Sequence, residues 1–206
     1  MHREGRSRIQ LALKRSIDII GATAGLVLLL PLFLVLAMLV KVDSLRGLIL
    51  YAHTRVGRKG RPFTCYKFRT MVPQADALKS DLRHLNELGN GFFFKMRADP
   101  RLTRVGRYLR RYSLDELPQL FNVLRGDMSL VGPRPSPVDE FEMYQTSHLR
   151  RLDVKPGITG LWQIVGRRDP AFDRAMEVDR DYVDRWSVWL DLAILVKTIP
   201  VLAHGA

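Results

Sequence analysis

A run of 22 consecutive residues without a charged side chain, residues 19–40, is the feature that most restricts how this chain can fold. Its sequence is IIGATAGLVLLLPLFLVLAMLV. As an α-helix rising about 1.5 Å per residue, it would reach roughly 33 Å, the thickness of a bilayer core. A cleaved signal peptide is the alternative, but its apolar stretch would be shorter, and the KVDSLRG that follows offers no small-residue cleavage site. The run is therefore expected to be a membrane segment.

Basic residues flank the run on both sides. They are Arg3, Arg6, Arg8, Lys14 and Arg15 before it, and Lys41, Arg46, Arg55, Arg58, Lys59 and Arg61 after it. Lys and Arg close to a membrane segment stay on the cytoplasmic face, so a straight span would carry one cluster across. Pro31 offers a solution, because it removes a helical hydrogen bond and kinks the helix. We expect a re-entrant helix broken at Pro31 whose two ends return to the same face, with an ordinary, slightly kinked transmembrane helix as the alternative.

The chain has 206 residues, enough for one domain with a core of its own and too few for two comfortable ones. We expect residues 1–42 to form a basic lead and the re-entrant helix, and residues 43–206 to form a cytoplasmic domain with interfacial helices. The formal net charge of +12 favours an anionic partner, which could be nucleic acid, a phosphorylated small molecule or an acidic leaflet. The single cysteine, Cys65, leaves no intramolecular disulfide to form and is expected to be a small packed residue.

After the membrane segment, the sequence predicts an α+β fold in which helices dominate. β-Branched and aromatic residues on both sides of Gly57–Gly60 predict a small β-hairpin. Leu78, Leu82 and Leu85 at helical spacing, followed by Gly-Asn-Gly, predict a helix. The other expected elements are short helices at 104–112 and 117–127, a loop at 129–140, a helix with Phe141 and Tyr144, a loop at 153–167 and a helical region from 172 to 202.

The last helical region combines tryptophans with aliphatic residues. Trp186 and Trp189 are followed by an apolar stretch that Asp191 and Lys197 interrupt. Tryptophan on an amphipathic helix suits a membrane interface, because the ring is half buried while the indole N–H stays hydrated. The pattern is also compatible with a helix packed on the domain core.

Two adjacent carboxylates, Asp115 and Glu116, stand in a stretch that is otherwise basic. Ser113 and Glu116 match a capping box at the start of a helix. Pro118 argues against a helix that begins there, because as the fifth helical residue it would lack the N–H that should donate to Leu114. The regular helix is then expected to begin at Asp115 or Glu116. Four arginines are expected around Asp115 at the mouth of this helix: Arg110, Arg111, Arg125 and, if the chain folds back, Arg134.

An acid among arginines has two chemical uses. It can hold Mg²⁺, or it can attack phosphorus as a nucleophile while guanidinium groups hold the phosphate. The GPRP motif around Arg134 favours the second use, because the flanking prolines stiffen the backbone and the guanidinium projects from a fixed base. A structural turn with an exposed arginine is the alternative for this motif.

Five segments, in this order, resemble the bacterial sugar transferase family. They are KRSIDI with an apolar run broken by proline, YKFRTM, DPRLTRVGRYLRRYSLDELPQLFNVLRGDMSLVGPRP, KPGITGLWQIVGR and DYVDRWSVWLDLAILVKTI, spanning residues 14–199. The resemblance is to the monotopic phosphoglycosyl transferases that start lipid-linked glycan assembly, and most of all to the catalytic domain of the exopolysaccharide and O-antigen initiating members. In large relatives several transmembrane helices precede this domain, so the chain is expected to be a natural short form or a truncation of a longer protein.

The resemblance implies an activity and a nucleophile. Such enzymes transfer a sugar 1-phosphate from a nucleotide diphosphate sugar, usually a UDP-sugar, to undecaprenyl phosphate and release UMP. Asp115 would be the nucleophile that forms a phosphosugar-aspartyl intermediate. Mg²⁺ would be held near Asp115 and Glu116, with Glu116 either positioning the ion or serving as a base.

The resemblance also implies residues that bind the phosphates of the substrate. Arg110 and Arg134 match family positions that handle phosphate. Lys67, Arg69 and Asp179 are candidates for supporting roles.

The location implied by the resemblance is the cytoplasmic (inner) membrane of a bacterium, with the catalytic domain on the cytoplasmic face. There the acceptor phosphate and the soluble donor meet. Membrane lipids are expected partners, nucleic acid is not, and a homodimer is compatible because dimers occur among the larger relatives. The chain departs from the family at Leu30, since relatives often have serine before the proline, and this removes one possible partner for the broken helix.

Two other classes of function fit parts of the sequence. The two short helices and the charge of +12 superficially resemble a helix-turn-helix, which would make the chain a membrane-anchored nucleic-acid-binding module. The apolar run has no place in an ordinary protein of that class. A non-enzymatic membrane scaffold is the second alternative, and it would have no need of acids among arginines.

Overall fold

The computed structural model describes residues 7–75, 77–78, 82, 96, 99–166 and 171–204. Within these residues the chain is an α+β structure in which helices dominate, as predicted, with a three-stranded antiparallel sheet and a two-stranded parallel sheet. The helix expected from Leu78, Leu82 and Leu85 lies largely outside the described residues.

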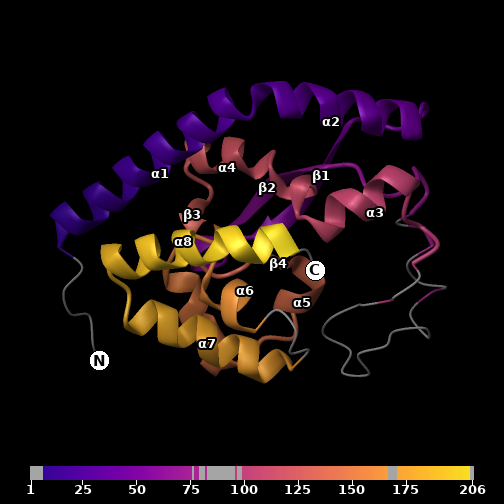
Figure 1. The fold of residues 1–206 in the computed structure, drawn as a ribbon. Coiled ribbons are helices and arrows are strands. Elements are labelled where there is room, and N and C mark those ends of the chain that lie inside the picture. Colours follow the sequence, from indigo (N-terminus) through magenta and orange to yellow (C-terminus); the bar gives the residue numbers. More distant parts are fainter. Residues whose placement is uncertain are drawn as a thin grey trace.

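The α-helices surround the short strands (Figure 1). They are α1 (Arg8–Leu28), α2 (Leu30–Asp43), α3 (Arg104–Arg111), α4 (Gln119–Arg125), α5 (Val138–Phe141), α6 (Leu161–Val165), α7 (Phe172–Asp184) and α8 (Val188–His204). The 3₁₀ helices are η1 (Arg58–Gly60), η3 (Leu114–Glu116) and η4 (Thr146–Asp153). The strands are β1 (Leu50–Val56), β2 (Pro62–Phe68), β3 (Ser129–Val131), β4 (Ser136–Pro137) and β5 (Gly157–Thr159).

Helices α1 and α2 contain the apolar run and are bent by 63° relative to each other at Leu29. Pro31 is the second residue of α2, where a missing N–H costs little because no helical partner awaits it. The chain therefore breaks two residues before the proline. No described helix is long and apolar enough to cross a bilayer alone, whereas this bent pair meets the same criterion when its two helices are taken together.

Polar side chains anchor α1 to the body of the protein. Arg15 donates hydrogen bonds of 2.6 and 2.8 Å to the carbonyl oxygens of Val123 and Leu124 in the last turn of α4. Asp18, which is only 3% exposed, accepts a hydrogen bond of 2.9 Å from the hydroxyl of Ser129 in β3. Because buried polar groups are costly when unpaired, these contacts fix both the position and the rotation of α1.

Asp191 in α8 is a second buried anchor. Its carboxylate lies 2.6 Å from Lys14 Nζ of α1 and accepts hydrogen bonds from Tyr182 Oη and Trp186 Nε1, at 2.8 and 3.1 Å. Nearby, Ile194 is 1% exposed and packs in the cluster that contains Tyr182. One face of α8 is thus packed on the core, as the second interpretation of this region predicted.

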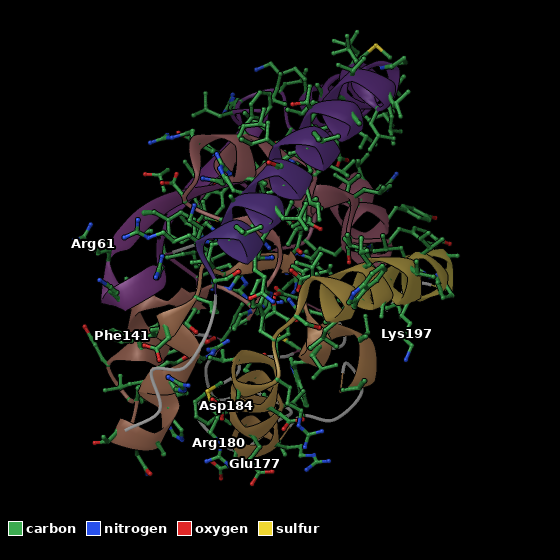
Figure 2. The ribbon with its side chains drawn as sticks, turned by 90° about the vertical axis from the view of Figure 1, so that its left-hand side faces the viewer. Arg61, Phe141, Glu177, Arg180, Asp184 and Lys197 are labelled. Atoms are coloured by element: carbon green, nitrogen blue, oxygen red, sulfur yellow. The ribbon has the colours of Figure 1, made fainter. Side chains whose placement is uncertain are left out.

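The outer face of α8 is apolar and exposed. Trp189 is 80% exposed, and Val196 and Ile199 are exposed about two and almost three turns further along the helix. Lys197 points away from the same helix (Figure 2). The two interpretations of this region therefore describe two faces of one helix, and burial of the outer face at a membrane interface stays a prediction.

Helix α7 presents charged residues outward and apolar residues inward. Glu177, Arg180 and Asp184 point away from the body in Figure 2, while Met176 and Val183 are buried. The expected single helical region from 172 to 202 is thus two helices, α7 and α8, with a break at 185–187.

The predicted β-hairpin is confirmed. Strands β1 and β2 pair in register from Leu50↔Phe68 to Val56↔Pro62, and η1 joins them with Lys59 and Gly60 in the left-handed region. Strand β4 then pairs with the end of β1, so the sheet order is β2-β1-β4. Cys65 is fully buried, as expected of a small packed residue.

The prediction that residues 129–140 and 153–167 form loops was wrong in part. The segment 129–140 contains β3 and β4, and the segment 153–167 contains β5 and α6. These strands have two or three residues each, too few for an alternating pattern to be visible in the sequence. The helix expected at Phe141 and Tyr144 is α5, which ends at Phe141 and leaves Tyr144 beyond it.

Candidate active site

The Asp115–Glu116 pair lies against the end of strand β2. Lys67 Nζ is 2.6 Å from Glu116 Oε1 and 3.9 Å from Asp115 Oδ2. The pair belongs to η3, which packs on β2 and connects α3 to α4. The hairpin therefore supplies the cation, and the turn between the two short helices supplies the acids.

The local backbone differs from both sequence interpretations of this stretch. Ser113 has φ 55°, ψ 23° in the left-handed region, and its side chain makes no capping hydrogen bond, so the capping box is wrong. A helix beginning at Asp115 or Glu116 is also wrong, because both residues lie in the 3₁₀ turn. The regular helix begins at Gln119, directly after Pro118, whose missing N–H does no harm before the first turn.

The two carboxylates differ in their electrostatic surroundings. Asp115 is 6% exposed, and its burial raises the pKa of its carboxyl group above the usual value, against the opposing charge of Lys67. Burial would also raise the pKa of Glu116, but the charges of Lys67 and Arg134 lower it to about 2. Glu116 is therefore the ionised partner of Lys67, whereas Asp115 is a buried acid whose desolvation outweighs the effect of the neighbouring positive charges.

A second arginine, Arg151, holds the backbone of Arg134 in place. Arg151 donates to the carbonyl oxygen of Arg134 at 2.8 Å and to the hydroxyl of Ser136 at 2.7 Å. Arg151 in turn forms an ion pair of 2.6 Å with Asp179 of α7, and the two side chains are 6% and 2% exposed. Arg151 also donates to the hydroxyl of Tyr144. The backbone of the GPRP motif is thus fixed by buried contacts as well as by its prolines, while the side chain of Arg134 lies at an exposed position.

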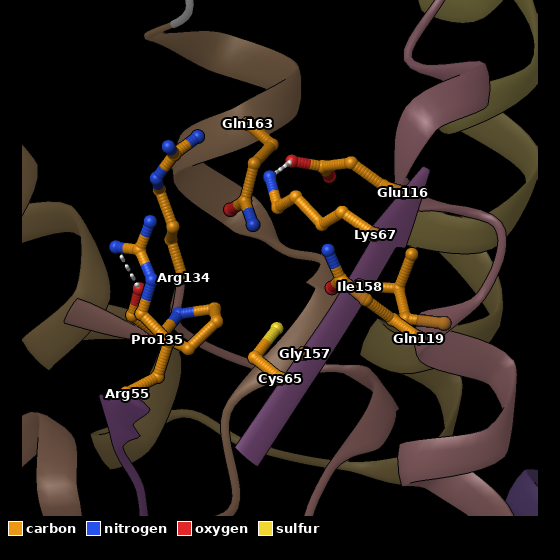
Figure 3. A pocket seen from close by; sticks show the side chains of 10 residues that line it. All are labelled: Arg55, Cys65, Lys67, Glu116, Gln119, Arg134, Pro135, Gly157, Ile158 and Gln163. Carbon is orange, nitrogen blue, oxygen red and sulfur yellow. Dashed lines mark hydrogen bonds and ion pairs between the residues drawn. The ribbon is translucent and has the colours of Figure 1, made fainter. Parts of the chain in front are cut away.

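A cavity joins these elements (Figure 3). It is lined by Arg55, Cys65, Lys67, Glu116, Gln119, Arg134, Pro135, Gly157, Ile158 and Gln163. In Figure 3, Lys67 and Glu116 stand on one side, with Arg55 and Arg134 on the other. The cavity therefore has carboxylate and ammonium groups at one end and guanidinium groups at the other.

Of the predicted phosphate-binding residues, Lys67 and Arg134 line this cavity. Arg110 donates from Nε to the hydroxyl of Thr70 at 3.0 Å, and its charge partly opposes the burial that raises the pKa of Asp115. Arg69 and Asp179 do not line the cavity. Arg69 donates to the carbonyl oxygen of Leu48 at 2.9 Å and stacks on Tyr51. Asp179 pairs with Arg151, which in turn contacts the backbone of Arg134.

Two arginines expected around Asp115 have other partners. Arg111 lies over the ring of Tyr112, and Arg125 pairs with Asp127 at 3.4 Å.

Sequence reasoning missed Arg55, His53 and Gln163. Arg55 and His53 alternate on one face of β1, opposite positions of β2 that include Cys65. Polar residues at every second position of a predicted hairpin strand are the signal that could have indicated a lined cavity. Gln163 gave no such signal, because it was placed in a loop.

The donor atoms around Asp115 fit a magnesium ion only in part. Among the described residues, no group of three or more acidic, histidine or cysteine side chains is arranged to hold a metal. Mg²⁺ is, however, usually bound by one or two carboxylates together with oxygens of a substrate phosphate. Asp115 and Glu116 are such a pair, and a diphosphate substrate would have to complete the set.

This arrangement suits nucleophilic attack on a phosphorus atom. A buried carboxylate is poorly solvated, so less water must be displaced before its oxygen can reach an electrophile. Lys67 and Arg134 place positive charge where a phosphoryl group would gain negative charge during the reaction.

The sequence matches known proteins over almost its whole length. The family model described as bacterial sugar transferase matches residues 9–205. The chain is 46% identical over 193 residues to the undecaprenyl-phosphate galactose phosphotransferase of Salmonella typhimurium, covering 92% of this chain and 40% of that protein. It is 45% identical over 193 residues to the UDP-galactose-lipid carrier transferase of Erwinia amylovora, again covering 92% and 40%.

A shorter relative matches over most of both proteins. The chain is 44% identical over 192 residues to the exopolysaccharide production protein ExoY of Rhizobium meliloti, covering 92% of this chain and 84% of ExoY. The chain thus spans less than half the length of the two longer relatives and most of the length of the shorter one.

Proposed function

This chain belongs to the bacterial sugar transferase family, and from that premise we propose that it transfers a sugar 1-phosphate from a UDP-sugar to undecaprenyl phosphate and releases UMP. The observation that carries the proposal is the buried carboxylate of Asp115 beside Lys67, which lines a cavity together with Glu116 and Arg134. The names of two relatives, one with UDP-galactose and one with undecaprenyl phosphate, support this choice of donor and acceptor. UDP-galactose is accordingly the first donor to test.

The first chemical step would be formation of a covalent intermediate on Asp115. One carboxylate oxygen forms a bond to the β-phosphorus of the donor, the phosphorus that bears the sugar. The bond from that phosphorus to the oxygen bridging to the α-phosphate breaks, and its electron pair leaves with UMP. Lys67 and Arg134 would offset the negative charge on the phosphoryl oxygens and the leaving phosphate.

The second step would regenerate the free carboxylate. A phosphate oxygen of undecaprenyl phosphate attacks the same phosphorus, and the bond from phosphorus to Asp115 breaks. The product is undecaprenyl diphosphate sugar, and the enzyme returns to its starting state. Because donor and acceptor react in turn with one carboxylate, the kinetics would be ping-pong.

Asp115 and Glu116 are the residues that would hold Mg²⁺ with the donor diphosphate. When bound, the ion would neutralise charge on the phosphates. Lys67 would keep Glu116 ionised and in place, so that it remains available as a ligand or a base.

The membrane segment would serve this reaction by lying in one leaflet. The bent pair α1–α2 has the length and composition for a re-entrant segment, and its outer side chains are largely apolar and exposed. The exposed Trp189 face of α8 would lie at the interface. An active site at that level, on the cytoplasmic face, would meet both the lipid phosphate and the soluble donor.

Nucleotide release tests the proposed function. The protein, purified in detergent or nanodiscs, is expected to release about one UMP per active site from its UDP-sugar donor alone, and to turn over continuously when undecaprenyl phosphate is added. EDTA should stop both. A panel of UDP-sugars that begins with UDP-galactose would identify the donor. A protein that shifts DNA at about 150 mM salt but releases no UMP from any donor would favour the nucleic-acid-binding alternative.

The re-entrant topology has its own test. In a Cys65→Ala background, Gly5→Cys and Leu45→Cys flank the bent pair, and neither is expected to react with a membrane-impermeant maleimide in intact spheroplasts. Both should react after permeabilisation. Reaction of just one of the two cysteines from outside would mean that the segment spans the membrane.

A further inference from the structure

Arg55 reaches the cavity from the middle of the sheet, and two contacts fix its guanidinium. Its Nη1 donates to the carbonyl oxygen of Pro135 at 3.2 Å. Its Nε lies 3.3 Å from each ring nitrogen of His53, two residues earlier on the same face of β1. Arg55 is therefore tied to the strand on one side and to the GPRP loop on the other.

Arg55 and Arg134 line the cavity together, and no described carboxylate forms an ion pair with either. Burial lowers the pKa of Arg55 below its usual value, and the like charge of Arg134 lowers it further, while the carboxylates of Glu140 and Glu116 act in the opposite direction. Two neighbouring guanidinium groups repel each other unless negative charge lies close to both. Glu140 offsets this repulsion only in part, and a bound phosphate would offset it further.

His53 is suited to hold Arg55 without adding to this charge. Burial, together with the charges of Arg55, Lys67 and Arg134, lowers the pKa of His53 to about 3. The imidazole is therefore neutral at physiological pH and has one ring nitrogen free to accept a hydrogen bond from Arg55.

We propose that Arg55, oriented by His53, binds with Arg134 the phosphate group that leaves as part of the nucleoside monophosphate. This inference rests on the proposed function and adds a binding residue and a positioning residue to it. In an in-line displacement the leaving oxygen departs on the side opposite the attacking oxygen. Lys67 and Glu116, the neighbour of Asp115, stand on one side of the cavity and the two arginines on the other (Figure 3), so the leaving phosphate would lie on the arginine side.

Binding of UMP and of uridine to the resting protein tests the proposal. Isothermal titration calorimetry on full-length Arg55→Gln is expected to show UMP binding roughly 10- to 100-fold weaker than in the wild type, because a hydrogen-bonded charge pair is lost. Uridine, which lacks the phosphate, should bind both proteins equally. Arg61→Gln is the matched control, since Arg61 is an exposed arginine at the hairpin turn that points away from the body (Figure 2), and it should leave UMP binding unchanged.

Substitutions of His53 test its positioning role. His53→Leu removes the acceptor and should weaken UMP binding in the same way as Arg55→Gln, whereas His53→Gln retains an acceptor and should restore most of the affinity. Arg55→Lys, which keeps the charge but not the forked donor, should fall between the wild type and Arg55→Gln. Thermal unfolding of each variant shows whether the protein is folded at the temperature of the titration.

Three outcomes would overturn the proposal: wild-type UMP affinity in folded Arg55→Gln and Arg55→Lys, an equal loss for uridine and UMP, or a wild type that binds neither UMP nor pyrophosphate. The proposed function can fail separately. If no UDP-sugar is turned over but pyrophosphate binds the wild type and not Arg55→Gln, the anion site stands and the assignment of transfer falls. If transfer proceeds and UMP binding is independent of Arg55, only the role of Arg55 falls.

Discussion

Asp115→Asn is expected to reduce UMP release by a factor of roughly 10³ or more, because the amide oxygen is a far weaker nucleophile than a carboxylate oxygen. The substitution keeps the size of a side chain that is 6% exposed, so the fold should persist. Steady-state release and the single-turnover burst with donor alone should both be lost. Intact-protein mass spectrometry of the wild type incubated with donor alone should show a phosphosugar adduct that the Asn variant lacks.

The control for this substitution is Asp184→Asn. Asp184 lies on the exposed face of α7 and pairs with Arg150, so its amide variant should keep both the burst and steady turnover. An adduct mapped by peptide sequencing to another residue, or turnover by Asp115→Asn comparable with that of Asp184→Asn, would refute the nucleophile assignment.

Arg151→Met should cost about 3–5 kcal/mol of unfolding free energy, because it leaves Asp179 buried without its cationic partner. Urea denaturation in detergent at constant pH would measure the loss. The pKa of Asp179 is already raised by burial, and losing Arg151 should raise it further. Since the folded variant would then bind a proton that the unfolded chain has released, its stability should fall as pH rises above about 4.

The neighbouring Arg150→Met supplies a matched control. Arg150 forms exposed pairs with Asp153 and Asp184, and such pairs contribute only about 0–1 kcal/mol. A loss for Arg151→Met no larger than for Arg150→Met would contradict the importance of the buried pair.

A double variant separates stability from positioning. Arg151→Met with Asp179→Leu removes both charges and should recover much of the lost stability, as apolar replacements of buried ion pairs often do. It would not restore the hydrogen bond to the carbonyl oxygen of Arg134. Transfer activity should therefore stay low in the stable double variant, and wild-type activity there would show that Arg151 does not position Arg134.

The parts of the fold that the sequence predicted well are those with a strong local pattern. The hairpin around Gly57–Gly60 is flanked by β-branched and aromatic residues, α3 and α7 have amphipathic spacing, and α8 contains a long apolar stretch. The break in the apolar run was also predicted from Pro31, although the chain bends at Leu29.

The parts that were missed depend on contacts distant in sequence. Ser113 adopts a left-handed backbone that no local rule demands, and this displaces the start of α4 to Gln119. The parallel pair β3–β5 joins residues 28 positions apart, so neither strand is recognisable alone. For the same reason the sequence singled out Lys67 and Arg134, which stand in conspicuous motifs, and overlooked Arg55, whose role depends on the loop that folds over it.

On the proposed topology, the hydrogen bonds that hold α1 would set the distance between Asp115 and the lipid tails. Arg15 ties the helix to α4, which directly follows the Asp115–Glu116 turn, and Asp18 ties it to β3, which leads into the GPRP loop. The bent pair α1–α2 in the leaflet and the active site above it would therefore not tilt independently of each other. The fold would then fix the depth of the active site relative to the membrane surface, and the enzyme would act only on phosphates located at that depth.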